Sequence, residues 1–156
     1  MLKLRVVALG HRMPGWIADG WREYADRLPR DIALELVELK PEPRDRGKPV
    51  AALLAAEATR LGAACRGAGI VALDERGEGW TTRGFAERLA HWRDGAREIA
   101  FVIGSADGLD PAFKRAAEAT FALSALTLPH GLARVLLAEQ IYRAASLITG
   151  HPYHRD

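Results

Sequence analysis

The chain has 156 residues, of which 49% are hydrophobic and 27% charged, and its formal net charge is +2. These values are typical of one soluble domain, residues 1–156, that is long enough to bury a hydrophobic core. No apolar run is long enough to span a bilayer, and the charged opening Met1-Leu-Lys-Leu-Arg is unlike a secretory signal. The single Cys65 excludes an internal disulfide and favours a reducing compartment, so we expect a cytoplasmic protein with no membrane partner.

The distribution of basic residues is more informative than their total. They gather in two parts of the chain, Lys40, Arg44, Arg46 and Lys48 in one and Arg134, Arg143 and Arg155 in the other. A solvated loop with scattered surface cations explains this pattern as well as a nucleic-acid surface does. Charge alone therefore leaves RNA binding open.

Apolar runs and turn residues predict alternating strands and helices. In the first half we expect a strand over 4–9, a helix from Pro14 to Pro29, a strand over 32–39, and a helix over 50–61 ended by Gly62 or Gly67. In the second half we expect strands over 70–73, 99–103 and 121–128, and helices begun by Thr82, by Asp110-Pro111, and over 132–148.

Short apolar strands that alternate with helices are typical of a parallel sheet covered on both faces. We therefore predict an α/β fold, a three-layer α/β/α sandwich with a mostly parallel sheet of about five strands. Such sheets bind ligands at the carboxyl ends of their strands. This rule selects three candidate loops, at residues 73–74, 104–108 and 123–130.

The glycine-rich segment Gly104-Ser-Ala-Asp-Gly108 follows a predicted strand and precedes a predicted helix. It lacks the G-x-G-x-x-G dinucleotide fingerprint and the Gly-Lys-Ser/Thr ending of a phosphate loop. Ser105 also lacks the flanking glycines of a nucleophile elbow. A ligand-contacting loop and a plain turn both remain open.

Two further groups near the carboxyl end invite a functional interpretation. His151 and His154 are too few to hold a metal ion, and Cys65 has no partner spacing, so we predict no metal site. Glu139 and Arg143 stand four apart on the last predicted helix. They form either an ordinary helical ion pair or a charged pair at a pocket rim.

The most specific motifs lie in the last third of the chain: Leu123-Ser-Ala-Leu-Thr-Leu-Pro-His130, Arg134-Val-Leu-Leu-Ala-Glu-Gln-Ile-Tyr-Arg143 and His151-Pro-Tyr-His-Arg155. Earlier segments agree with them: Met13-Pro-Gly-Trp16, Val71-Ala-Leu-Asp74 and Phe101-Val-Ile-Gly104. Together they closely resemble the bacterial large-subunit ribosomal RNA methyltransferase H family. Its members are small SPOUT-class enzymes that methylate N3 of a pseudouridine in 23S rRNA, and the resemblance spans the whole chain.

The resemblance implies a C-terminal trefoil knot, a homodimer and the cofactor S-adenosyl-L-methionine, bound in the knot beside the subunit interface. Carried over to this sequence, the cofactor contacts are Leu73, Gly104, Leu123, Ser124, Ala125, Leu126, Thr127 and Leu128. They fall in the three loops selected above. At Ser105-Ala-Asp107 the sequence departs from the family's usual turn, which has a second glycine, a proline and a glutamate.

For catalysis, the resemblance directs attention to the tail residues Tyr153, His154 and Arg155, with Glu139 and Arg143 holding the tail or contacting RNA. His154 is the candidate general base, because its ordinary pKa is near neutrality. The implied substrate is pseudouridine 1915 of 23S rRNA in the assembled ribosome. The 40–48 loop and the Arg134 region would contact phosphates.

Two alternatives stay open at this stage. One is a catalytically silent module that keeps the fold and binds RNA or the ribosome, which the altered turn at 105–107 favours. The other is a SPOUT methyltransferase with a different RNA target.

Overall fold

The computed structural model of the chain describes residues 1–44 and 47–153, and within them a five-stranded sheet forms the centre of the fold. Its strands are β1 (Leu2–Leu9), β2 (Ile32–Leu39), β3 (Gly69–Gly79), β4 (Glu98–Ile103) and β5 (Ala119–Ala122). They lie in the order β2-β1-β4-β3-β5, and all neighbours are parallel. The predicted parallel sheet is confirmed.

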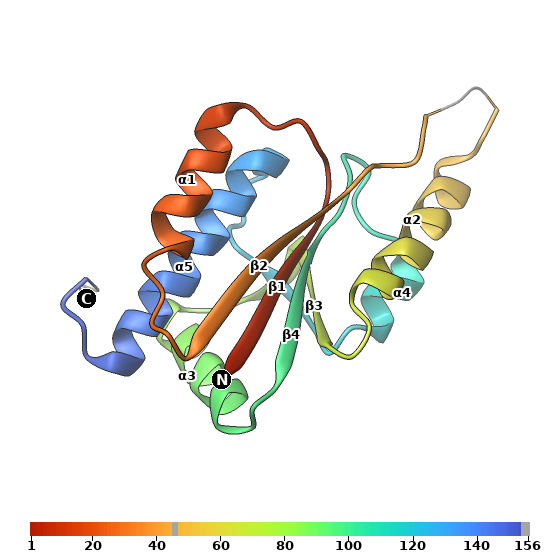
Figure 1. Cartoon of the computed structure of the whole chain (residues 1–156). Helices are drawn as coiled ribbons and strands as arrows, with labels where there is room; N and C mark the ends of the chain where they lie inside the picture. The colour runs from red at the N-terminus through yellow and green to blue at the C-terminus, as the bar shows by residue number, and fades with distance from the viewer. Residues whose placement is uncertain (45–46, 154–156) are drawn as a thin grey trace.

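Helices cover both faces of the sheet. They are α1 (Gly15–Ala25), α2 (Val50–Ala64), α3 (Thr82–Asp94), α4 (Pro111–Ala116) and α5 (His130–Thr149). Figure 1 shows α1 and α5 side by side on one face, with α2 and α4 on the other. The side chains of α3 join the cluster of α1 and α5, so the predicted three-layer sandwich is confirmed.

The core explains why the strands have continuous apolar runs. Successive side chains of a strand point to opposite faces. In β1, Leu4 and Val6 pack with α1, α3 and α5, whereas Val7 and Leu9 pack toward α2 and α4. A strand covered on both faces needs near-continuous apolar residues, as in the stretch from Val6 to Leu9 of β1.

Several predicted boundaries are wrong. The helix α1 ends at Ala25 instead of Pro29, and α2 continues through Gly62 to Ala64. Local hydrogen bonds explain two of the other differences. The last strand stops at Ala122 instead of continuing to Leu128, because Ser124 Oγ accepts the Leu126 amide (2.9 Å) and turns the chain. The helix α3 is capped by Thr81, whose hydroxyl accepts the Gly84 amide (3.0 Å), and not by Thr82. The strand β3 continues to Gly79 because it pairs with β5 again after a register shift.

The described ranges 1–44 and 47–153 contain no helix that is long and apolar enough to cross a membrane. The helix α5 returns across the sheet and packs between α1 and α3. The trefoil knot stays a prediction.

Candidate functional site

A cavity of about 460 Å³ opens at the carboxyl edge of the sheet. The segment after β5 lines it together with Leu73, the turn from Gly104 to Leu109, and the first turn of α5. Its volume lies within the range of about 300–1,000 Å³ that is usual for small-molecule sites. All the predicted cofactor contacts line it except Ala125: Leu73, Gly104, Leu123, Ser124, Leu126, Thr127 and Leu128.

The turn between β4 and α4 is built on two glycines. The Gly108 amide donates to the Ser105 carbonyl (2.9 Å), and Gly108 has a φ of +84°, which favours glycine. A Cβ on Gly104 would lie 2.5 Å from the Gly108 carbonyl oxygen. The turn therefore closes tightly although its middle residues differ from the family pattern.

The imidazole of His130 joins this turn to the start of α5. Its Nδ1 lies 3.0 Å from the Gly104 carbonyl oxygen, and since a carbonyl only accepts, Nδ1 is the donor. Burial, together with the nearby Arg134 cation, lowers the pKa of His130, so the ring is neutral at pH 7. Among the described residues Nε2 is buried without a hydrogen-bond partner. The sequence selected the loop up to His130 but not this side chain.

A polar rim faces the cavity from β3 and α4. Lys114 Nζ lies 2.6 Å from Asp74 Oδ2, and Thr127 Oγ1 donates to Glu75 Oε2 (2.6 Å). Burial raises the pKa of Asp74, but hydrogen bonds from Lys114 and the Arg76 amide outweigh it and lower that pKa overall. Sequence reasoning noted Asp74 only as a strand-end residue and missed Lys114, since nothing local relates two residues 40 positions apart.

The predicted catalytic residues that the structure describes gather in a second place, on α5 and just beyond its end. Arg143 Nε and the Tyr153 hydroxyl both donate to Glu139 Oε1, at 2.9 and 3.1 Å. The Tyr153 ring packs against Tyr142, with centroids 4.5 Å apart. Burial and the bond to Glu139 raise the pKa of Tyr153 to about 12, so its hydroxyl is a donor at neutral pH and not a base.

This tail cluster, Glu139, Arg143 and Tyr153, is separate from the cavity of its own chain. The first turn of α5, with His130, lines the cavity, and Glu139 follows nine residues later. At 1.5 Å per residue this is about 14 Å along the helix axis. The predicted tail residues His154 and Arg155 lie outside the described residues.

One prediction about the basic residues is wrong. The Arg134 side chain is only 1% exposed, and it donates to Glu38 Oε2 (2.8 Å) and to the Gly10 carbonyl (2.7 Å). A buried guanidinium with these partners ties α5 to the first two strands and is not a phosphate contact. Within residues 1–44 and 47–153 no group of three or more His, Cys, Asp or Glu side chains could hold a metal ion.

Comparison with known proteins defines the class. The family model described as "Predicted SPOUT methyltransferase" matches residues 2–154. A ribosomal RNA large subunit methyltransferase H from Nitrosospira multiformis is 57% identical over 158 residues, with 99% of both chains covered. A protein of the same name from Burkholderia multivorans is 53% identical over 155 residues, again with 99% of both covered. The chain belongs to the ribosomal RNA large subunit methyltransferase H family of SPOUT methyltransferases.

Solved structures agree with the fold. A methylase-family protein from Haemophilus influenzae has a TM-score of 0.59 at 15% identity, with 99% of this chain and 70% of that chain covered. One from Neisseria gonorrhoeae has a TM-score of 0.53 at 15% identity, with 90% and 81% covered. At such low identity the likeness concerns the fold alone.

Proposed function

We propose that this protein transfers a methyl group from S-adenosyl-L-methionine to N3 of pseudouridine 1915 of 23S rRNA in the assembled ribosome. Family membership and the names of its relatives support a ribosomal RNA methyltransferase. The observation that carries the proposal is the cavity at the carboxyl edge of the sheet, where the family's cofactor motifs converge. An enzyme that acts on ribosomes would work in the cytoplasm.

The chemistry of the cavity fits this cofactor. Leu73, Leu123 and Leu128 offer apolar surface for an adenine ring, and the loop between them offers backbone groups for its polar edge. The acidic side chains of Asp74, Glu75 and Asp107 also line the cavity. Arg76 and Lys114 line it too, and Lys114 is paired with Asp74. The cavity therefore offers charges of both signs to a ligand that carries a sulfonium, an ammonium and a carboxylate group.

We further propose that the protein acts as a homodimer in which the tail of one subunit completes the cavity of the other. Glu139 of the tail cluster lies six residues, or about 9 Å along α5, beyond Ala133, which lines the cavity of its own chain. Trp16 and Leu126 are large apolar side chains that are 61% and 74% exposed, as residues that become covered by a partner would be.

In this mechanism S-adenosyl-L-methionine supplies an electrophilic methyl group, and the protein supplies alignment and proton handling. Alignment of donor and acceptor accounts for much of the acceleration in such displacements. The Tyr153 hydroxyl, protonated at neutral pH, would exchange its bond to Glu139 for a hydrogen bond to the charge that develops when N3 loses its proton. His154 would accept that proton, Arg155 would contact the imidate oxygens, and Glu139 and Arg143 would hold the tail.

The test combines ribosomes and RNA mapping. Ribosomes from cells that lack this protein are incubated with the purified protein and S-adenosyl-L-methionine, and their RNA is digested and mapped by mass. We expect one added methyl group on the fragment that contains pseudouridine 1915. Methylation elsewhere would favour a different RNA target. No heat on calorimetric titration with S-adenosyl-L-methionine would favour the silent module suggested by the altered turn at 105–107.

A further inference from the structure

Arg44, in the loop between β2 and α2, reaches across to the turn that lines the cavity. Its Nη2 donates to Ser105 Oγ (2.8 Å), and its Nε donates to Asp107 Oδ2 (3.1 Å). Its Nη1 donates to Glu57 Oε2 of α2 (3.0 Å). One guanidinium thus joins three segments that are far apart in the sequence.

Glu57 is the anchor of this group. It lies on the inner face of α2 and is 1% exposed, although a buried carboxylate is unfavourable unless its oxygens are paired. Here Oε1 accepts the Ser105 hydroxyl (2.9 Å), and Oε2 accepts the Glu42 amide (3.0 Å) as well as Arg44. Loss of one partner leaves a buried charge under-paired, so the group holds together as a unit.

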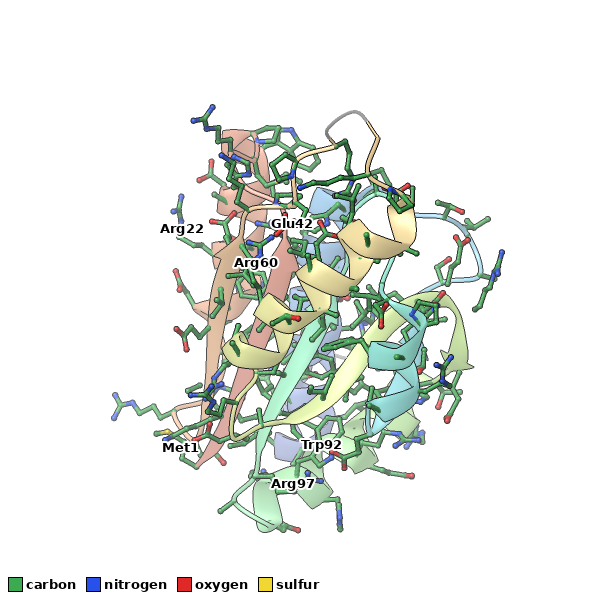
Figure 2. All side chains as sticks on the ribbon, turned by 90° about the vertical axis from the view of Figure 1, so that its right-hand side faces the viewer. Met1, Arg22, Glu42, Arg60, Trp92 and Arg97 are labelled. Atoms are coloured by element: carbon green, nitrogen blue, oxygen red, sulfur yellow. The ribbon has the colours of Figure 1, made fainter. Side chains whose placement is uncertain are left out.

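The loop that carries Arg44 is fixed to α2 at a second point. Figure 2 labels Arg60 of α2 beside Glu42, and Arg60 Nε lies 3.3 Å from Glu42 Oε1. An exposed ion pair alone would contribute little. Arg44 is different, because its guanidinium binds the buried Glu57 carboxylate and the neighbouring Glu42 is paired with Arg60. Its guanidinium is therefore held in one orientation.

The two turn residues bound by Arg44, Ser105 and Asp107, both line the cavity. The backbone of the turn is closed by the bond between Gly108 and Ser105, which fixes its shape but not its angle to the sheet. His130 holds the turn at Gly104, whereas Arg44 and Glu57, from outside the cavity, bind its side chains. Those side chains, Ser105 and Asp107, belong to residues at which the sequence departs from the family's usual turn.

We propose that Arg44, anchored by Glu57, is a positioning residue for the cofactor turn between Ser105 and Gly108. This inference rests on the proposed function, because it assigns the role through S-adenosyl-L-methionine. It also replaces the prediction that Arg44 contacts RNA phosphates. The guanidinium uses its donors within the protein, and its effect reaches the ligand through the turn.

The main experiment compares cofactor affinity and turnover in Arg44→Ala with the unaltered protein. We expect the calorimetric Kd for S-adenosyl-L-methionine to rise about tenfold, within the range usual for coupled sites. At saturating cofactor, kcat on ribosomes should stay within about twofold, because the turn is ordered once the ligand is bound. Arg44→Lys should recover only part of the affinity, because an ammonium cannot match the fork of a guanidinium.

The matched control is Arg66→Ala. Arg66 is exposed after α2, and its side chain forms no hydrogen bond or ion pair with the described residues. This variant removes the same charge and should leave the Kd unchanged. Thermal unfolding of each variant shows whether a change of affinity reflects a change of fold.

A second variant guards against an indirect effect of Arg44→Ala on stability. Ser105→Ala should raise the Kd about threefold, and the double variant should match Arg44→Ala alone, because both changes break one network. Additive losses, or a Kd in Arg44→Ala equal to that of the unaltered protein, would overturn the inference. A fall in kcat with an unchanged Kd would overturn it too. If the unaltered protein fails to bind S-adenosyl-L-methionine, the proposed function itself is overturned, which is a distinguishable result.

Discussion

Gly104 offers the most direct test of the cavity, because the structure shows what a side chain would meet there. A Cβ at this position would lie 2.5 Å from the Gly108 carbonyl oxygen, 2.7 Å from its carbonyl carbon and 2.9 Å from Leu109 Cγ. The first two are backbone atoms of a closed turn and cannot move without opening it. Overpacking of this kind costs about 1–3 kcal/mol.

In Gly104→Ala this cost can lower either the stability of the fold or the affinity for the cofactor. If the turn keeps its place, the free energy of unfolding falls, and the midpoint of thermal unfolding drops by about 2–12 °C. If the turn moves, S-adenosyl-L-methionine binds more weakly, by up to about 150-fold for 3 kcal/mol. We expect the loss in free energy of unfolding and the loss in free energy of cofactor binding to total about 1–3 kcal/mol. Thermal melts without ligand measure the first, and calorimetric titration measures the second.

Gly62→Ala is the matched control. Gly62 lies inside α2, and a Cβ there would meet nothing within 4 Å. Alanine at a helical position stabilises by about 0.4–1 kcal/mol, so this variant should melt at the same or a slightly higher temperature and bind the cofactor normally. If Gly104→Ala behaves like Gly62→Ala in both assays, the description of the turn is wrong.

Three further predictions concern the tail, the rim and the dimer. Tyr153→Phe removes the hydroxyl bound to Glu139 and should lower kcat on ribosomes by about 10- to 100-fold while the cofactor Kd stays unchanged; an equal loss of both would count against a separate tail cluster. The pKa of Asp74 is lowered in the folded state, so its contribution to stability is present at neutral pH and is lost as the pH falls below about 4. The difference in free energy of unfolding between the unaltered protein and Asp74→Asn should therefore shrink in acid, and a difference that grows in acid would refute this. If Gly104→Ala weakens cofactor binding, heterodimers of a Tyr153→Phe subunit with a Gly104→Ala subunit should be more active at limiting S-adenosyl-L-methionine than either homodimer, because one of their two composite sites is intact; a heterodimer no more active than the homodimers would contradict a tail acting across subunits.

Most of the sheet could be predicted from the sequence, because strands buried on both faces leave apolar runs with clear limits. The range 32–39 was predicted without error. The end of β5 could not be predicted, since Leu126 and Leu128 read as strand residues although the chain has already turned at Ser124. The turn depends on the Ser124 hydroxyl, and the strand propensity of the neighbouring residues gives no sign of its hydrogen bond.

The candidate site could also be predicted only in part. The loops that line the cavity were predicted because the edge of a parallel sheet brings strand ends together whatever their sequence separation. Side-chain partners such as Arg44 with Ser105, or Lys114 with Asp74, were not predictable. Glu57 shows the difficulty. It is a charged residue on the otherwise apolar face of α2, and it is buried there because it binds Ser105, which lies 48 residues away in the sequence.

The helix α5 touches the cavity with its first turn and carries Glu139 and Arg143 of the tail cluster farther along. Because a helix is rigid, it fixes the distance between the cavity and the tail cluster. A single inserted residue would lengthen this distance and rotate the two sites by about 100° relative to each other. The interval of nine residues from His130 to Glu139 therefore cannot change in length without moving the tail cluster relative to the cavity.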